Sequence, residues 1–204
     1  MIIINNVTIS CNKKNTKLDN YLFGKDLTYI HILCKSNNNS NKKEITMKLI
    51  INNLDNYAFL SKANEFNKFD GEGSNISPSL RWQDYPEETK SFALTVYDPD
   101  APTGSGFWHW IAYDIPTTIS SLPEDINNSP SATAFKQAMT DYGFNEYSGP
   151  CPPKGDIAHR YIFKIHALNC ESLNIDPQAP NAVVRFILNS VTIDTASVTV
   201  LYKR

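Results

Sequence analysis

The residues of this chain that could do chemistry lie on four short segments, several of them stiffened by proline. Together they supply two acids, Asp98 and Asp100, two histidines, His109 and His159, and a phenol, Tyr161. The segments are Asp98-Pro99-Asp100-Ala101-Pro102, Trp108-His109-Trp110, Gly149-Pro150-Cys151-Pro152-Pro153 and His159-Arg160-Tyr161. Half-buried imidazoles and carboxylates need hydrogen-bond partners, so their combination predicts a shared pocket rather than a packed core.

The chemistry expected of such a pocket is anion binding. A carboxylate accepts a hydrogen bond from one imidazole nitrogen and thereby fixes the tautomer of the ring. The other ring nitrogen, the Tyr161 hydroxyl and loop N–H groups then suit the oxygens of phosphate, sulfate or carboxylate. An acid left free could accept an ammonium group, which makes a phosphate–amine zwitterion a candidate ligand. The proline-rich wall around Cys151 predicts a pocket that is pre-formed.

The two-residue period of strands predicts which side chains share a face. It groups Asp98 with Asp100, His159 with Tyr161, and His109 with Phe107 and Ile111. It directs Trp108 and Trp110 away from His109, and His166 away from His159. We also expect anion affinity to rise as the pH falls through the region where imidazoles gain their charge, near pH 6.

Enzymatic alternatives remain open at this point. His109, His159 and an aspartate could hold a metal ion, and Cys151 with His159 could form a thiolate and its base. Either arrangement would fit a hydrolase or lyase that uses the two histidines as acid and base. Because Cys151 lies between prolines without a visible oxyanion donor, we predict a binding protein that is not an enzyme and has no cofactor or metal. An interaction protein with a vestigial pocket is a third hypothesis.

Length and composition indicate one globular domain with an appendage. The chain has 204 residues, of which 41% are hydrophobic and 20% charged, as in ordinary globular proteins. A net charge of −2 gives no electrostatic reason to expect nucleic acid as a partner. No apolar run reaches the roughly 20 residues of a membrane-spanning helix, so no transmembrane segment is predicted.

The first 46 residues differ from the rest. They are rich in Asn and Lys, and residues 36–41 form a low-complexity polar tract. We therefore predict a poorly structured or atypical N-terminal extension over 1–46 and the domain proper over 47–204. The apolar start, residues 1–4, lacks the basic region of a signal peptide, which favours a cytoplasmic location and reduced thiols. A bridge between Cys151 and Cys170 stays open.

Strand signals dominate the domain. Aromatic and β-branched runs predict strands over 92–97, 107–115, 161–168 and 197–202. One helix is predicted to start near Asp176 and Pro177, with Val183, Phe186, Ile187 and Ser190 on one face. Many strands and 12 prolines predict a mainly β fold: an antiparallel β-sandwich or Greek key with a short C-terminal helix and peripheral helical turns.

The motifs resemble those of the phosphatidylethanolamine-binding protein family, and most closely its bacterial YbhB/YbcL branch, the Raf kinase inhibitor-like proteins. The resemblance covers about residues 47–204. It is carried by Asn75-Ile76-Ser77-Pro78 with Leu80 and Trp82, by Asp98 to Gly104, by Phe107 to Trp110, by Gly149 to Gly155, and by His159 to Phe163.

The resemblance implies a fold of antiparallel sheets with a small C-terminal helix. It also implies a pocket for phosphate or phosphoethanolamine-like head groups. Matched residue by residue, the pocket would be formed by Asp98, Asp100, His109, Pro153, His159 and Tyr161. Eukaryotic members regulate kinases and other signalling proteins, so the expected partners are a phosphate-bearing small molecule, a phospholipid head group and a signalling protein.

Overall fold

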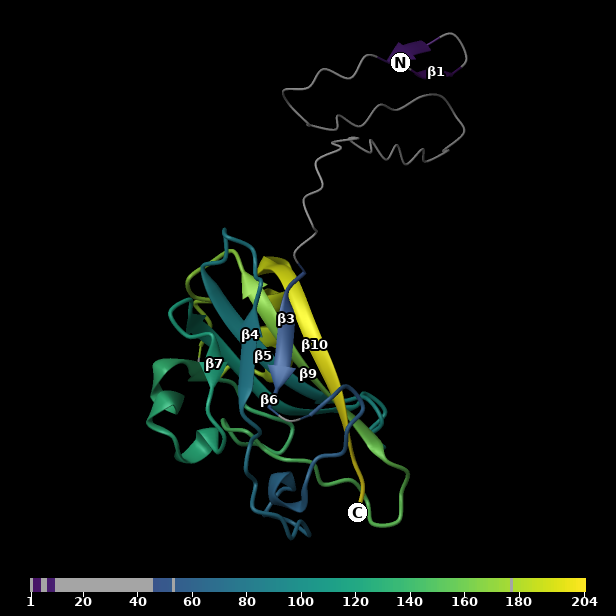
Figure 1. Ribbon diagram of the computed structural model, residues 1–204, viewed down its shortest axis with the longest axis vertical. Coiled ribbons are helices and arrows are strands. Elements are labelled where there is room, and N and C mark those ends of the chain that lie inside the picture. Colours follow the sequence, from purple (N-terminus) through teal and green to yellow (C-terminus); the bar gives the residue numbers. More distant parts are fainter. Residues whose placement is uncertain (1, 5–6, 10–45, 53, 177) are drawn as a thin grey trace. The chain divides into compact units, whose positions relative to one another are not determined.

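The computed structural model describes residues 2–4, 7–9, 46–52, 54–176 and 178–204. By its internal contacts the chain divides into two units, residues 1–42 and 43–204. In the first unit, β1 (Ile2–Ile4) and β2 (Val7–Ile9) form an antiparallel pair (Figure 1). The predicted low-complexity tract and most of the predicted extension lie outside the described residues.

The second unit consists of two antiparallel sheets (Figure 1). The larger sheet has the strand order β10-β9-β5-β6-β8, and the smaller has the order β3-β4-β7. Their strands are β3 (Lys48–Ile51), β4 (Leu80–Gln83), β5 (Ser91–Asp98), β6 (Phe107–Pro116), β7 (Ser121–Leu122), β8 (Lys136–Gln137), β9 (His159–Leu168) and β10 (Thr192–Tyr202). Three 3₁₀ turns lie in the connections, at Lys62–Asn64, Ile126–Asn128 and Pro130–Ala134. The predicted antiparallel, mainly β fold is confirmed.

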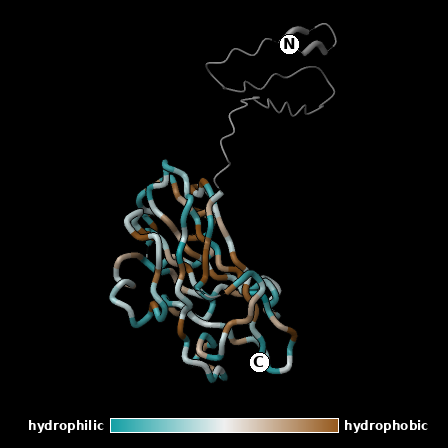
Figure 2. The backbone as a smooth tube through the Cα atoms, viewed as in Figure 1, coloured by the Kyte–Doolittle hydropathy of each residue, from teal (hydrophilic) through white to brown (hydrophobic). Residues whose placement is uncertain are grey.

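Apolar side chains from both sheets fill the space between them. Trp82 of the smaller sheet and Phe92 of the larger meet edge to face, with ring centroids 5.5 Å apart. Hydrophobic segments accordingly run along the strands of this unit (Figure 2). Burial of one such large side chain stabilises the fold by about 1.5–3 kcal/mol, so this layer holds the two sheets together.

The other face of the larger sheet is covered by α1 (Asn181–Val191). A helix was predicted in this region, but it starts later than predicted, and the face named in the prediction is not the one that is most deeply buried. It begins after Pro180, and Val184 and Leu188 face the sheet, whereas Val183 and Phe186 are exposed. The apolar residues that pack against the sheet are at positions 184, 187, 188 and 191. The predicted set, at positions 183, 186, 187 and 190, has the same spacing one position earlier in the chain, so the sequence alone does not distinguish the two.

The four predicted strands are present and longer than predicted, and one of them contains a bulge that matters for the site. Val96 pairs with Trp110 and Tyr97 pairs with Trp108, so His109 is an extra residue in β6. A bulge of this kind breaks the alternation of side chains. His109 therefore contacts the ring of Tyr161 on the inter-sheet side, where Trp110 also lies. The prediction that His109 and Trp110 face opposite ways is wrong, and so is the grouping of His109 with Ile111, which lies in the cluster under α1.

No helix among the described residues is both long and apolar enough to cross a membrane.

Gly149 is held where two segments of backbone cross, and this crossing makes the fold sensitive to its substitution. A Cβ atom there would lie 2.1 Å from the Asn64 carbonyl oxygen and 2.9 Å from the Phe66 nitrogen. We expect Gly149→Ala to lower the free energy of unfolding by about 3 kcal/mol, because backbone atoms cannot move aside cheaply.

Urea denaturation of this variant checks the expectation. Gly104→Ala is the control, since Gly104 (φ +79) faces open space and only backbone strain of about 1 kcal/mol applies there. Equal losses in the two variants would contradict the steric argument.

Candidate functional site

The acidic proline turn fixes one buried carboxylate. Asp98 is the last residue of β5, and its Oδ1 accepts hydrogen bonds from the backbone N–H groups of Asp100 (2.8 Å) and Ala101 (3.1 Å). Its Oδ2 accepts from Nδ1 of His159 at 2.8 Å. The predicted contact between a carboxylate and an imidazole is therefore present, and the turn orients it.

His159, the first residue of β9, lies between two carboxylates. Its Nδ1–H donates to Asp98, and its Nε2 is 3.4 Å from Oδ2 of Asp156. Burial alone would lower the pKa of His159, but the two acids outweigh burial and the pKa is raised. Since an imidazolium donates from both nitrogens, His159 carries its positive charge to a higher pH than a free histidine.

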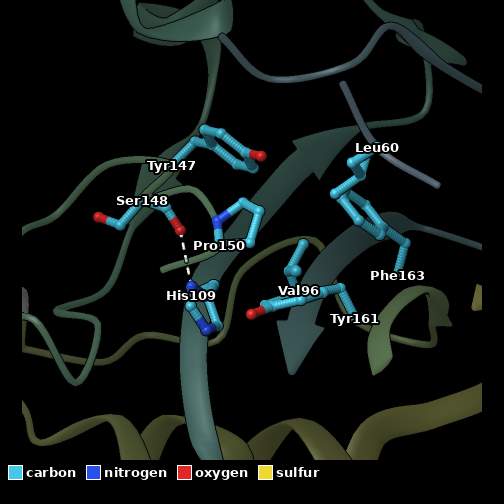
Figure 3. A pocket seen from close by; sticks show the side chains of 8 residues that line it. All are labelled: Leu60, Val96, His109, Tyr147, Ser148, Pro150, Tyr161 and Phe163. Atoms are coloured by element: carbon cyan, nitrogen blue, oxygen red, sulfur yellow. Dashed lines mark hydrogen bonds between the residues drawn. The ribbon is translucent and has the colours of Figure 1, made fainter. Parts of the chain in front are cut away.

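His109 has the opposite character. Its Nδ1 is 2.9 Å from the carbonyl oxygen of Ser148 (Figure 3). The same nitrogen is 3.1 Å from the carbonyl oxygen of Gly149. Carbonyl oxygens only accept, so Nδ1 carries the proton and Nε2 of the neutral ring is an acceptor. Burial lowers the pKa of His109, which keeps the ring neutral at physiological pH.

Tyr161 lies between these groups. It follows His159 by two residues on the same buried face, as predicted, and its ring centroid is 5.1 Å from that of His109. Burial, and then the Asp98 carboxylate, raise the pKa of its hydroxyl, which stays protonated. The Asp98 carboxylate lies near enough to this buried hydroxyl to raise its pKa, but within the described part of the chain no hydrogen bond of normal geometry is formed. The hydroxyl is therefore a donor inside the site that is not fully satisfied.

A narrow hollow lies beside His109 and Tyr161, and neither Asp98 nor His159 lines it. It is lined by His109, Tyr161, Pro150 and Tyr147, with further apolar side chains behind them (Figure 3), and it has no room for a water molecule. The ring of Tyr142 packs edge-on against His109 and stacks on Phe66. Aromatic rings distant in sequence thus fill the space beside His109, and this hollow is not the open pocket that was predicted. The predicted pocket between the two histidines stays a prediction.

Two predicted site residues lie apart from this group. The Asp100 carboxylate accepts from Nε of Arg160 at 2.9 Å and from its Nη2 at 2.6 Å, and this guanidinium lowers the pKa of Asp100. Asp100 does not extend the face of Asp98, because the chain leaves the strand at Pro99. Pro153 is exposed on the loop before β9, where its carbonyl oxygen accepts from the N–H of Asp156. His166 lies away from His159 as predicted, beside Thr95.

Several residues of the site were missed from the sequence. Asp156 lies three positions before His159, and that spacing was a visible signal. Asn75 anchors the segment that holds His109: its Oδ1 accepts from the Gly149 N–H at 2.7 Å, and its Nδ2 donates to the Tyr147 carbonyl at 3.1 Å. Tyr142 gave no signal in sequence, because its contact with His109 depends on the fold.

The described residues show neither a contact between Cys151 and His159 nor a cluster of metal ligands, the two arrangements that the enzymatic alternatives require. Cys151 donates to Asp70 at 3.5 Å rather than to His159, and burial raises the pKa of its thiol to about 11. Cys151 and Cys170 are free and not bridged. Within the described ranges, no group of three or more His, Cys, Asp or Glu side chains could hold a metal ion.

Comparison with known proteins decides the family. The family model described as phosphatidylethanolamine-binding protein matches residues 56–203. The chain belongs to this family. The resemblance inferred from the motifs is thus confirmed, and all four residues of the site, Asp98, His109, His159 and Tyr161, lie inside the matched region.

Two relatives of known sequence come from Escherichia coli K12. The chain is 46% identical to the UPF0098 protein YbcL over 147 residues, which are 71% of this chain and 80% of YbcL. It is 42% identical to the UPF0098 protein YbhB over 158 residues, 76% of this chain and 99% of YbhB. These matches confirm the YbhB/YbcL branch.

A crystal structure supports the same assignment. That of E. coli YbcL, described as a new member of the mammalian family, matches with a TM-score of 0.73 and 42% identity. The match covers 78% of this chain and 98% of YbcL. The two-sheet fold is therefore the fold of the family.

The ion pair of Asp98 with His159 gives a prediction about stability. We expect Asp98→Asn to lower the free energy of unfolding by about 3 kcal/mol near pH 6, because it leaves a buried imidazolium without its charged partner. Urea denaturation measures the loss, and the histidine resonances in NMR should show a lower pKa for His159. Asp100→Asn is the control, and its half-exposed ion pair with Arg160 should cost less than about 1 kcal/mol.

The same prediction has a pH dependence of definite sign. A histidine whose pKa is raised by folding stabilises the fold below its unfolded pKa of about 6.5, and this stabilisation is lost as the pH rises through the folded pKa. The stability difference between the parent protein and Asp98→Asn should therefore shrink from pH 6 upward. A difference that grows with pH would contradict the charged state assigned to His159.

Proposed function

We propose that this protein binds the phosphate group of a small ligand between His109, His159 and Tyr161, as a binding protein without catalytic activity. The observation that supports the proposal is the Tyr161 hydroxyl, a buried donor beside Asp98 that makes no hydrogen bond of normal geometry within the described residues. Leaving such a donor unsatisfied costs about 1–3 kcal/mol, which a ligand oxygen would recover. The neighbouring imidazolium of His159 supplies a positive charge for the same ligand.

The states of the two histidines favour a phosphate that still carries a proton. His159 and Tyr161 offer donors to an anionic oxygen, whereas neutral His109 offers an acceptor at Nε2. Monohydrogen phosphate and singly protonated phosphate monoesters supply both an anionic oxygen and an acidic O–H. Sulfate has no such O–H at neutral pH, so it could contact His109 only after that ring gains a proton.

The proposed source of the phosphate group is either a small phosphate monoester or a phospholipid head group. Only the monoester supplies both the anionic oxygen and the acidic O–H, whereas the phosphodiester of a phospholipid has no acidic O–H and, like sulfate, could contact His109 only after that ring gains a proton. Membership of the phosphatidylethanolamine-binding protein family supports the second source as well as the first. A signalling partner, carried over from the family resemblance, and a cytoplasmic location are also part of this proposal.

Calorimetry on Tyr161→Phe tests the role of this hydroxyl. We expect the variant to bind inorganic phosphate and phosphoethanolamine about tenfold more weakly, since a hydrogen bond to a charged group contributes roughly 1.5–3 kcal/mol. Its stability should be unchanged or higher, because the lost hydroxyl is not fully satisfied in the free protein. Tyr113→Phe, on the opposite face of the larger sheet, is the control and should bind normally.

Unchanged phosphate affinity in Tyr161→Phe would end the proposal for this site. Titration with vesicles that contain phosphatidylethanolamine, alongside soluble phosphoethanolamine, distinguishes the lipid source from the soluble one. Turnover of phosphate esters that is lost in His159→Ala would instead show an enzyme.

The pH dependence of sulfate binding tests the state of His109. Because burial lowers the pKa of His109, the free protein holds this ring neutral, and a bound anion must draw a proton onto it. We expect sulfate affinity to rise steadily as the pH falls from 8 to 5, and phosphate affinity to change less near neutrality. Calorimetry in two buffers of different ionisation enthalpy should show proton uptake with sulfate, and a flat sulfate profile would contradict this assignment.

A further inference from the structure

The outward nitrogen of His159 is Nε2, the ring nitrogen that does not contact Asp98. It already faces a second carboxylate of the protein itself. Oδ2 of Asp156 lies 3.4 Å from Nε2 of His159, while Oδ1 accepts from the N–H of Ile157 at 2.7 Å. The Asp156 side chain is 40% exposed, in contrast to the 3% of Asp98 on the other side of the ring. Two acids thus flank one imidazole, one built into the fold and one at its edge.

The two acids differ in how firmly they are held. Asp98 is 2.8 Å from the ring and accepts two backbone hydrogen bonds as well. The contact of Asp156 is longer than the 2.7–2.9 Å usual for hydrogen bonds between charged groups, so the outward N–H of His159 is incompletely used. An anionic oxygen that forms a hydrogen bond with this N–H must take the place of the Asp156 carboxylate.

Backbone hydrogen bonds hold the turn that leads into Asp156. The N–H of Gly155 donates to the carbonyl oxygen of Arg204 at 3.1 Å, and the N–H of Asp156 donates to that of Pro153 at 3.2 Å. Gly155 has φ +83 and closes the turn in a conformation that suits glycine. These two backbone hydrogen bonds do not involve the Asp156 carboxylate, so the carboxylate can turn away from His159 without breaking them, although it would give up the hydrogen bond from the Ile157 N–H.

We propose that Asp156 is a specificity-determining residue whose carboxylate competes with anionic ligands for Nε2 of His159. This inference rests on the proposed function, since it concerns the same site. The internal carboxylate acts as a resident anion: it neutralises the imidazolium in the free protein and must be displaced when a phosphate oxygen takes its place. Its charge then lies beside the bound anion and weakens binding further.

Titration of inorganic phosphate into three proteins tests this role. The proteins are the parent chain, Asp156→Asn, and Glu72→Gln, which also removes one exposed negative charge but contacts Lys154 on the same loop instead of His159. Calorimetry gives the affinity, and the side-chain resonances of His109 and His159 report where phosphate binds. We expect Asp156→Asn to bind phosphate about fivefold more tightly and Glu72→Gln to change affinity less than about twofold.

The outcomes separate the two proposals. Phosphate that shifts both histidine resonances but binds Asp156→Asn no more tightly than the parent overturns the competition and leaves the proposed function standing. An equal gain in Glu72→Gln also overturns it, because overall charge would then explain the effect. Phosphate that binds none of the three proteins at these histidines overturns both proposals together. Binding seen only in Asp156→Asn supports competition strong enough to mask the site.

Discussion

The contact between Asp98 and His159 is the interaction on which the site depends. Both side chains are buried, with relative exposures of 2% and 1%, and a buried imidazolium is tolerable only beside its carboxylate. Asp98 ends β5 and His159 begins β9, so the pair ties together the ends of two neighbouring strands. Tyr161 lies two residues after His159 on the same face of β9, and Asp156 lies three residues before His159. The position of His159 therefore fixes where both side chains can lie.

The sequence was informative wherever a feature depends on local chemistry. Strong β-forming runs predicted the four long strands, and the demand of a buried histidine for a carboxylate predicted its contact with an aspartate. Features that depend on competition in space were not predictable. The sequence pattern placed Asp100 in the site as readily as Asp98, but in the structure Asp100 pairs with Arg160 instead. The bulge at His109 arises from pairing with Val96 and Tyr97 on β5, which a strand's own sequence does not reveal.

The closed hollow has a similar origin. Tyr142 and Phe66 are far apart in sequence, yet their rings stack with centroids 4.3 Å apart beside His109. Proline in the wall favours a stiff backbone, but stiffness says nothing about open volume. Backbone carbonyls already accept from Nδ1 of His109, and neighbouring rings cover the site. Within the described residues, three groups of the site can still form a hydrogen bond with a ligand. They are the Tyr161 hydroxyl, the N–H at Nε2 of His159 with its long contact to Asp156, and the acceptor Nε2 of His109.

Two histidines in one small site thus hold different charges because their partners differ. Carbonyl oxygens orient His109 and burial lowers its pKa, while carboxylates on both sides raise the pKa of His159. Where His159 is charged, the site has a cationic donor in His159, a neutral acceptor in His109, and the phenol of Tyr161 close to both. A ligand that matches this polarity needs an anionic oxygen and an acidic hydroxyl on the same small group. Protonated phosphate meets that requirement, whereas a carboxylate or a sulfate at neutral pH supplies only the first.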